Sequence, residues 1–159
     1  MKPHWMLRVA WVTILLSAGT AHAAGVLYKK SVQAPVDEVY EALHEALEAH
    51  RMWVVFEADI GANIARFRDQ WGEDYNRNGL EAIRVLVVCN GWYANRVGNE
   101  DPDMLALCPQ RVTVIHRGGR TTVLFVRPTV VAGSSPAGKV LAEVEDAIVA
   151  AIDEATAGP

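Results

Sequence analysis

Apolar residues recur along this chain with two periods, which predict alternating strands and helices. Residues 26–32 and 52–58 alternate apolar and polar side chains, a pattern typical of half-buried strands. Residues 36–47 and 140–152 carry apolar side chains at helical spacing, so each segment predicts a helix with one buried face. The unbroken apolar run 83–88 favours a strand buried on both faces. In the second strand the predicted buried side chains are Met52, Val54, Phe56 and Ala58.

The remaining segments complete the predicted order of elements. Apolar residues in segment 60–71 are spaced by four, three and four positions, which predicts a short amphipathic helix. Residues 91–107 indicate a helical or irregular connection, and 111–116 and 121–127 are predicted strands joined by a Gly118-Gly119 turn. The order β-α-β-(α)-β-(α)-β-β-α implies an α+β domain, with a mainly antiparallel sheet and two long helices on one face.

The first 23 residues have the organisation of a secretory signal peptide. Basic Lys2 and Arg8 precede an apolar stretch from Val9 to Leu16, and the small residues of Ala21-His22-Ala23 are typical of a cleavage site. The apolar stretch is only about half as long as a membrane span requires. We therefore expect cleavage after Ala23, a single domain over residues 24–159, and a periplasmic or secreted protein.

The net charge of the chain limits the kinds of molecule that it is expected to bind. The chain has 15 basic and 19 acidic residues, and the predicted cleavage removes two of the basic ones. An acidic domain without a basic cluster in its sequence is a poor binder of nucleic acid. No second apolar run approaches membrane length, so we expect no nucleic-acid partner and no stable membrane insertion after cleavage.

The most informative stretch is Cys89-Asn90-Gly91, which follows a predicted buried strand and precedes a predicted helix. A cysteine at such a junction lies where backbone N–H groups and the helix dipole favour a thiolate. The only other cysteine, Cys108, lies just before the next strand. In an oxidising compartment we expect a Cys89–Cys108 disulfide, and the alternatives are a redox-active pair or two inert buried thiols.

The residues after Cys89 also allow two interpretations. Asn90 is the natural N-cap of the following helix. The same geometry can present free N–H groups beside Trp92 and Tyr93 to a small anion or polar ligand. The aromatic pair is equally compatible with core packing or a dimer contact. The predicted ligand site therefore comprises Cys89, Asn90, Gly91, Trp92 and Tyr93.

Two metal sites are further hypotheses. Asp74, Asn76 and Asn78 precede Gly79 with the spacing of the first half of a calcium loop, although the alternative is an Asn-Gly turn that leads into a strand. Val85 occupies the position where such a loop needs its bidentate glutamate. Soft ligands of the kind that copper prefers are also present. The copper hypothesis comprises Met104, Cys108 and His116, with Cys89 as a possible fourth ligand.

Several motifs together resemble the bacterial domain-of-unknown-function 302 family over about residues 25–130. They are the segments 34–39, 57–60, 89–91 and 101–114. Two departures are visible: Gly91 replaces the family proline, and Cys108 stands two positions earlier than the family cysteine. The resemblance implies a TATA-binding-protein-like β-α-β₄-α fold that often forms a dimer, and it implies no established activity.

These observations favour a small exported, non-catalytic accessory or ligand-binding protein with its site near Cys89–Tyr93. The alternative is a periplasmic thiol-redox or metal-handling protein that uses Cys89 and Cys108, and a third possibility is a structural dimerisation module. The expected partners are a small-molecule ligand and a second copy of the chain.

Overall fold

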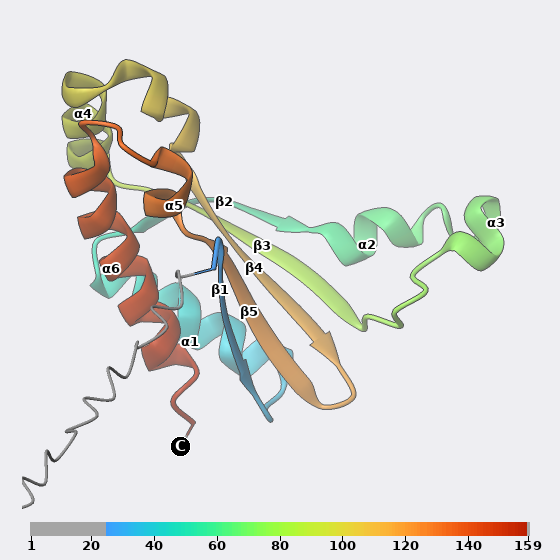
Figure 1. Cartoon of the computed structure of the whole chain (residues 1–159). Coiled ribbons are helices and arrows are strands. Elements are labelled where there is room, and N and C mark those ends of the chain that lie inside the picture. Colours follow the sequence, from blue (N-terminus) through green and yellow to red (C-terminus); the bar gives the residue numbers. More distant parts are fainter. Residues whose placement is uncertain (1–24, 159) are drawn as a thin grey trace, which may run out of the picture.

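A computed structural model describes residues 25–158, in which one five-stranded antiparallel sheet forms the centre of the fold (Figure 1). The strand order is β1-β5-β4-β3-β2, so β1 and β2 are the edge strands. This arrangement confirms the predicted α+β class and order of elements. The predicted signal peptide, residues 1–23, lies outside the described residues. The strands are β1 (Leu27–Val32), β2 (Trp53–Asp59), β3 (Ala82–Cys89), β4 (Gln110–Arg117) and β5 (Arg120–Val126).

Two long helices, α1 (Val36–Ala49) and α6 (Gly138–Ala155), pack against each other and cover one face of the sheet (Figure 1). The α2–α3 segment projects beyond the sheet on the side away from α6. The shorter elements are α2 (Ile60–Ala65), α3 (Arg68–Trp71), α4 (Gly91–Glu100), α5 (Pro128–Ala132), and the 3-10 turns η1 (Gly72–Asp74) and η2 (Pro102–Leu107).

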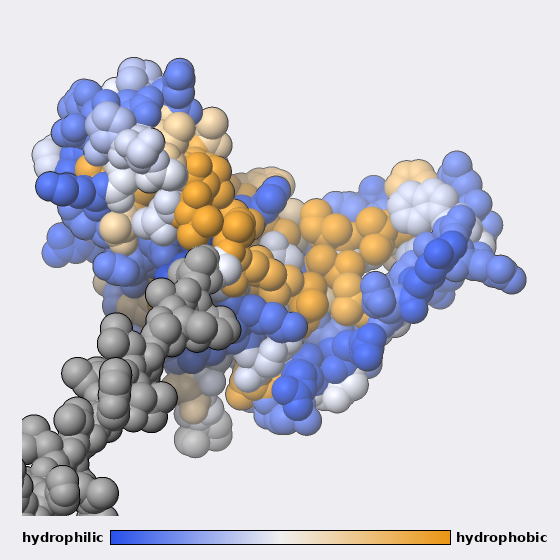
Figure 2. Space-filling model, in the orientation of Figure 1, coloured by the Kyte–Doolittle hydropathy of each residue, from blue (hydrophilic) through white to orange (hydrophobic). Residues whose placement is uncertain are grey.

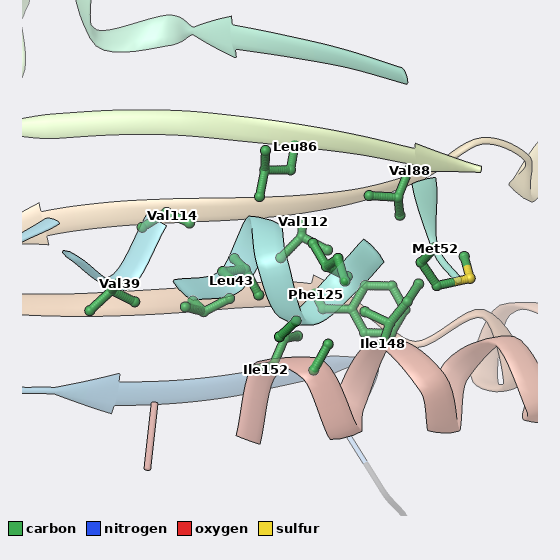
Figure 3. Close-up of a cluster of buried hydrophobic side chains, with 14 of the residues drawn as sticks. Val39, Leu43, Met52, Leu86, Val88, Val112, Val114, Phe125, Ile148 and Ile152 are labelled. Carbon is green, nitrogen blue, oxygen red and sulfur yellow. The ribbon is translucent and has the colours of Figure 1, made fainter. Parts of the chain in front are cut away.

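The main core lies between the sheet and these two helices (Figure 3). Leu43 and Leu47 of α1 and Ile148 and Ile152 of α6 are fully buried, as the helical period predicts. Phe125 of β5 is the largest side chain with almost no exposure, and it lies among them. The strands contribute Leu86, Val88, Val112, Val114, Val123 and Phe125 to this core.

A β-bulge in β2 overturns part of the predicted pattern. Val54 pairs with Val88 of β3, but Phe56 pairs with Val87, so Val55 is an extra residue in the ladder. An extra residue reverses the faces of all following side chains. Phe56, predicted to be buried, is therefore 61% exposed on the face away from α1.

The predicted 60–71 helix has different bounds in the structure. The 60–71 segment is broken at Arg66 and Phe67, and its rings are exposed instead of forming a buried stripe. Phe67 stacks on Trp71 with ring centroids 5.1 Å apart. The last helix begins at Gly138, since Ser135 accepts from the Ala137 N–H and donates to Asp101, which closes a turn before α6.

Candidate functional site

The face of the sheet opposite α1 and α6 is not covered by any described helix along most of its length, and it is strongly apolar (Figure 2). Hydrophobic residues form a band over the sheet from the α5 end towards α2. Since side chains alternate along a strand, odd-numbered residues of β3 and β4 and even-numbered residues of β5 point to this face. Four large apolar side chains on it are 42–61% exposed: Leu27, Trp53, Phe56 and Val126.

The charges on this face all have one sign. In the described strands β1 to β5, the side chains that point away from α1 and α6 include four cations and no carboxylate. Glu57 and Asp59 of β2 point to the helical side, where Glu57 accepts a hydrogen bond from the Tyr40 hydroxyl at 2.6 Å. This acidic protein thus presents a basic, apolar surface. The four cations are Lys29, Arg111, Arg117 and Arg120.

A pocket of about 390 Å³ opens on the uncovered face at the end where β3 finishes and β4 begins. Its volume is near the lower end of the range of about 300–1,000 Å³ that is typical of small-molecule sites. Most of the lining residues are apolar, although polar atoms form nearly half of the exposed wall, and Arg111 contributes the only formal charge. The lining residues are Val87, Ala106, Leu107, Pro109, Gln110, Arg111, Val126 and Pro128.

One side of the pocket is fixed by Gln110, which is 8% exposed. Its side-chain amide donates to the Leu107 carbonyl at 2.5 Å and so ties the end of η2 to the start of β4. Asp101 helps to fix the other end of η2, because its carboxylate accepts from the Asp103 N–H and from the Ser135 hydroxyl. The η2 wall of the pocket is therefore held in place without a ligand.

The opposite side of the pocket depends on a buried carboxylate. Glu145 of α6 is 4% exposed, and it accepts from Arg127 Nε at 2.6 Å and from both the N–H and the hydroxyl of Thr129. Burial alone would raise the pKa of Glu145, but the hydrogen bonds from Thr129 and Arg127 outweigh burial and lower it. Glu145 thereby fixes the corner between β5 and α5, where Val126 and Pro128 line the pocket.

Both cysteines are free thiols, so the structure does not contain the predicted disulfide. Neither lines the pocket, but Leu107 and Pro109, which flank Cys108, do. Cys89 ends β3 opposite Trp53, and Cys108 follows η2 immediately before Pro109. Burial raises the pKa of Cys108, and the nearby Cys89 raises it further. The two thiols are therefore close enough to interact, and the environment of Cys108 disfavours its thiolate.

The predicted ligand site at residues 89–93 is used mainly for structure. Asn90 accepts from the N–H groups of Trp92 and Tyr93 and donates to the Arg51 carbonyl at 2.8 Å. Its polar atoms are thus committed to capping α4 and to holding the turn after α1, where Arg51 has a positive φ. Tyr93 packs against the main core and against a second buried cluster that includes Val97 and Leu141. Trp92 is 66% exposed, and Gly91 begins α4.

The predicted calcium ligands do not converge. Asp74 pairs with Arg77, and the side chain of Asn76 both accepts from the Leu80 N–H and donates to the Leu80 carbonyl. The Asn78 carbonyl accepts from Arg117. This arrangement matches the alternative of a polar turn that leads into β3, because the side chains of Asp74 and Asn76 already have partners inside the protein.

The hypothetical copper ligands are also dispersed. His116 lies at the far end of β4 from Cys108, and its ring nitrogens lie 2.9 Å from the Thr121 hydroxyl and 3.4 Å from a Glu81 oxygen. Within residues 25–158, no three or more His, Cys, Asp or Glu side chains are grouped so that they can hold a metal ion.

A second polar cluster, which the sequence does not reveal, lies between α1 and β2. The Tyr40 hydroxyl donates to Glu57, His44 Nε2 lies 3.7 Å from the same carboxylate, and the Arg84 guanidinium lies over the Tyr40 ring. Burial, followed by the hydrogen bond to Glu57, raises the pKa of Tyr40 well above its ordinary value. The cluster exists because the bulge at Val55 turns Glu57 towards α1, and no local pattern predicts that bulge.

Comparison with known proteins identifies the family. None of the curated proteins matches this chain. A crystal structure of an uncharacterized conserved protein, DUF302, from Bacillus stearothermophilus is similar in fold, with a TM-score of 0.70 and 24% sequence identity over 82% of this chain and 98% of that one. The family described as "Domain of unknown function DUF302" matches residues 28–155, so this chain belongs to the DUF302 family.

Proposed function

We propose that this protein is a non-catalytic binding protein that holds a small, largely apolar ligand in the pocket between η2, β4 and α5. The main support for the proposal is the pocket itself, which is lined mainly by apolar residues and is fixed from both sides by Gln110 and Glu145. Preformed apolar cavities with a few polar groups are the usual form of small-molecule sites. The proposal moves the ligand from the Cys89–Tyr93 corner to the adjacent pocket, because the Asn90 side chain is already engaged with the backbone.

A thiol-redox function receives less support. The two free thiols lie close enough to interact, which favours it, but the raised pKa of Cys108 makes that thiol a poor nucleophile at neutral pH. We therefore assign to the cysteines the role of apolar neighbours of the pocket.

Export and a homodimer remain part of the proposal as expectations from the sequence. Within the described residues, no helix is long and apolar enough to span a membrane. Stacking the uncovered faces of two copies would bring the four cations of each sheet against those of the other. A dimer is therefore expected to use other apolar surface, such as Val130 and Val131 or the stacked Phe67 and Trp71. Sedimentation equilibrium tests this expectation, and a monomer at micromolar concentration would contradict it.

The neutral dye N-phenyl-1-naphthylamine tests the binding function, because its fluorescence increases in apolar sites. We expect saturable binding to the wild-type protein. Ala106→Trp fills the pocket and should abolish saturable binding, whereas Ala150→Trp, at an exposed position on α6, should leave it unchanged. The absence of saturable binding, or equal binding by Ala106→Trp, would contradict the proposal.

A further inference from the structure

The chemical class of the ligand follows from the one charged group in the pocket. Arg111 is exposed at the pocket, in the middle strand of the sheet, with Val87 as its cross-strand partner on β3. None of the ion pairs formed within residues 25–158 involves Arg111. By contrast Arg84, Arg96 and Arg127 each pair with a carboxylate at 2.5–2.7 Å.

An arginine without a carboxylate in an apolar wall has a clear chemical preference. The guanidinium is planar and presents paired N–H donors that match a carboxylate in two parallel hydrogen bonds. The other cations of this sheet face, Lys29, Arg117 and Arg120, add a positive potential that attracts anions to it.

We propose that the ligand is an amphiphile with one anionic group, a carboxylate in the simplest case, which binds Arg111 while its apolar body occupies the pocket. This inference rests on the proposed binding function and adds the charge and polarity of the ligand. Leu107, Pro109, Val126 and Pro128 would contact the apolar body. A cationic amphiphile of the same size would be excluded by Arg111 and by the potential of the surrounding face.

Octanoate and 1-octanol are suitable probes, since they share a chain length and differ in charge. We expect octanoate to bind the wild-type protein, and Arg111→Gln to weaken that binding at least about tenfold, which corresponds to about 1.4 kcal/mol. Octanol binding should not change in Arg111→Gln. Arg120→Gln is the matched control, because it removes the same charge from the same face at the far end of β5. Raising the salt concentration should weaken the binding of octanoate and leave the binding of octanol unchanged.

The outcomes separate the two proposals. If octanol binds the pocket as tightly as octanoate and Arg111→Gln changes neither, the inference about charge is wrong and the binding function stands. If Arg120→Gln weakens octanoate as much as Arg111→Gln does, the general potential of the face is responsible and the direct contact is wrong. Tight binding of octylammonium would also overturn the inference. If no probe and no dye binds, the binding function itself fails.

Discussion

Glu145 and Arg127 join α6 to the corner that follows β5 through a hydrogen bond of 2.6 Å between a glutamate oxygen and Arg127 Nε. The same carboxylate caps the first turn of α5 through Thr129. A buried carboxylate is stable only when its hydrogen bonds compensate for lost solvation. This pair therefore fixes one wall of the pocket as well as the packing of α6 on the sheet.

Glu145→Gln should destabilise the protein by about 2 kcal/mol at neutral pH, because it leaves the partly buried Arg127 without its charged partner. The pKa of Glu145 is lower in the folded state than in the unfolded state. The stabilisation of the protein by the Glu145 carboxylate is therefore complete above the unfolded pKa of about 4.3, and it is lost as the pH falls through the folded-state pKa. Urea denaturation at pH 7 and at pH 3–4 measures both effects. Asp146→Asn, at the exposed neighbouring position, should change the unfolding free energy little. A pH-independent difference between Glu145→Gln and the wild type would contradict the account.

Asn90→Ala should cost about 1–2 kcal/mol of stability, since it removes the cap of α4 and the bond to the Arg51 carbonyl. It should leave octanoate affinity within about twofold, because Asn90 does not line the pocket. Thermal unfolding and ligand titration of the same variant test the two roles separately. A stable variant that has lost binding would instead restore the 89–93 corner as the ligand site.

Phe125 and Val126 are adjacent on β5 and point to opposite faces of the sheet. Phe125→Ala removes the largest buried ring of the core and should destabilise the protein by about 3–5 kcal/mol. Val126→Ala, at a side chain that is 42% exposed, should cost less than about 1 kcal/mol. Similar costs in chemical denaturation would show that a partner covers the second face in solution.

Cys108 should react slowly with iodoacetamide at pH 7, with a rate that keeps rising at alkaline pH, because burial and Cys89 raise its pKa. The Cys89→Ser variant isolates the Cys108 reaction and should lower the apparent pKa of Cys108, since it removes the second cause. Mass spectrometry of the modified peptides assigns each rate. Rapid modification of Cys108 at pH 7 would favour the thiol-redox alternative.

The sequence predicts the elements of this fold more fully than its site. Helical periodicity identifies the buried face of α6, since Val144, Ile148 and Ile152 lie in the main core and Val140 and Leu141 lie in a second buried cluster. The alternation of apolar and polar residues does not predict the buried face of β2 after Val55. The bulge at that residue is determined by pairing with β3 and not by the local sequence. The pocket is also non-local, since Val87, Leu107 and Val126 meet only when three strands are in register.

At the Cys89–Asn90 junction the sequence predicts the local structure but not the ligand site. It correctly places a strand end, a capping residue and a neighbouring thiol at one corner of the sheet. The sequence does not show which hydrogen bonds Asn90 makes. Its side-chain amide is not free for a ligand because it donates to the Arg51 carbonyl, 39 positions away in the sequence. Arg111 carries no local signal either, because its lack of a carboxylate partner depends on the residues of the two neighbouring strands, β3 and β5.

Titration of ¹⁵N-labelled protein with octanoate, followed by amide chemical shifts, locates the bound ligand on the protein. We expect saturable shifts at Val87, Leu107, Arg111 and Val126, with little change at Trp92 and Tyr93, and loss of these shifts in Arg111→Gln. Shifts centred on residues 89–93, or none at millimolar octanoate, would contradict this expectation.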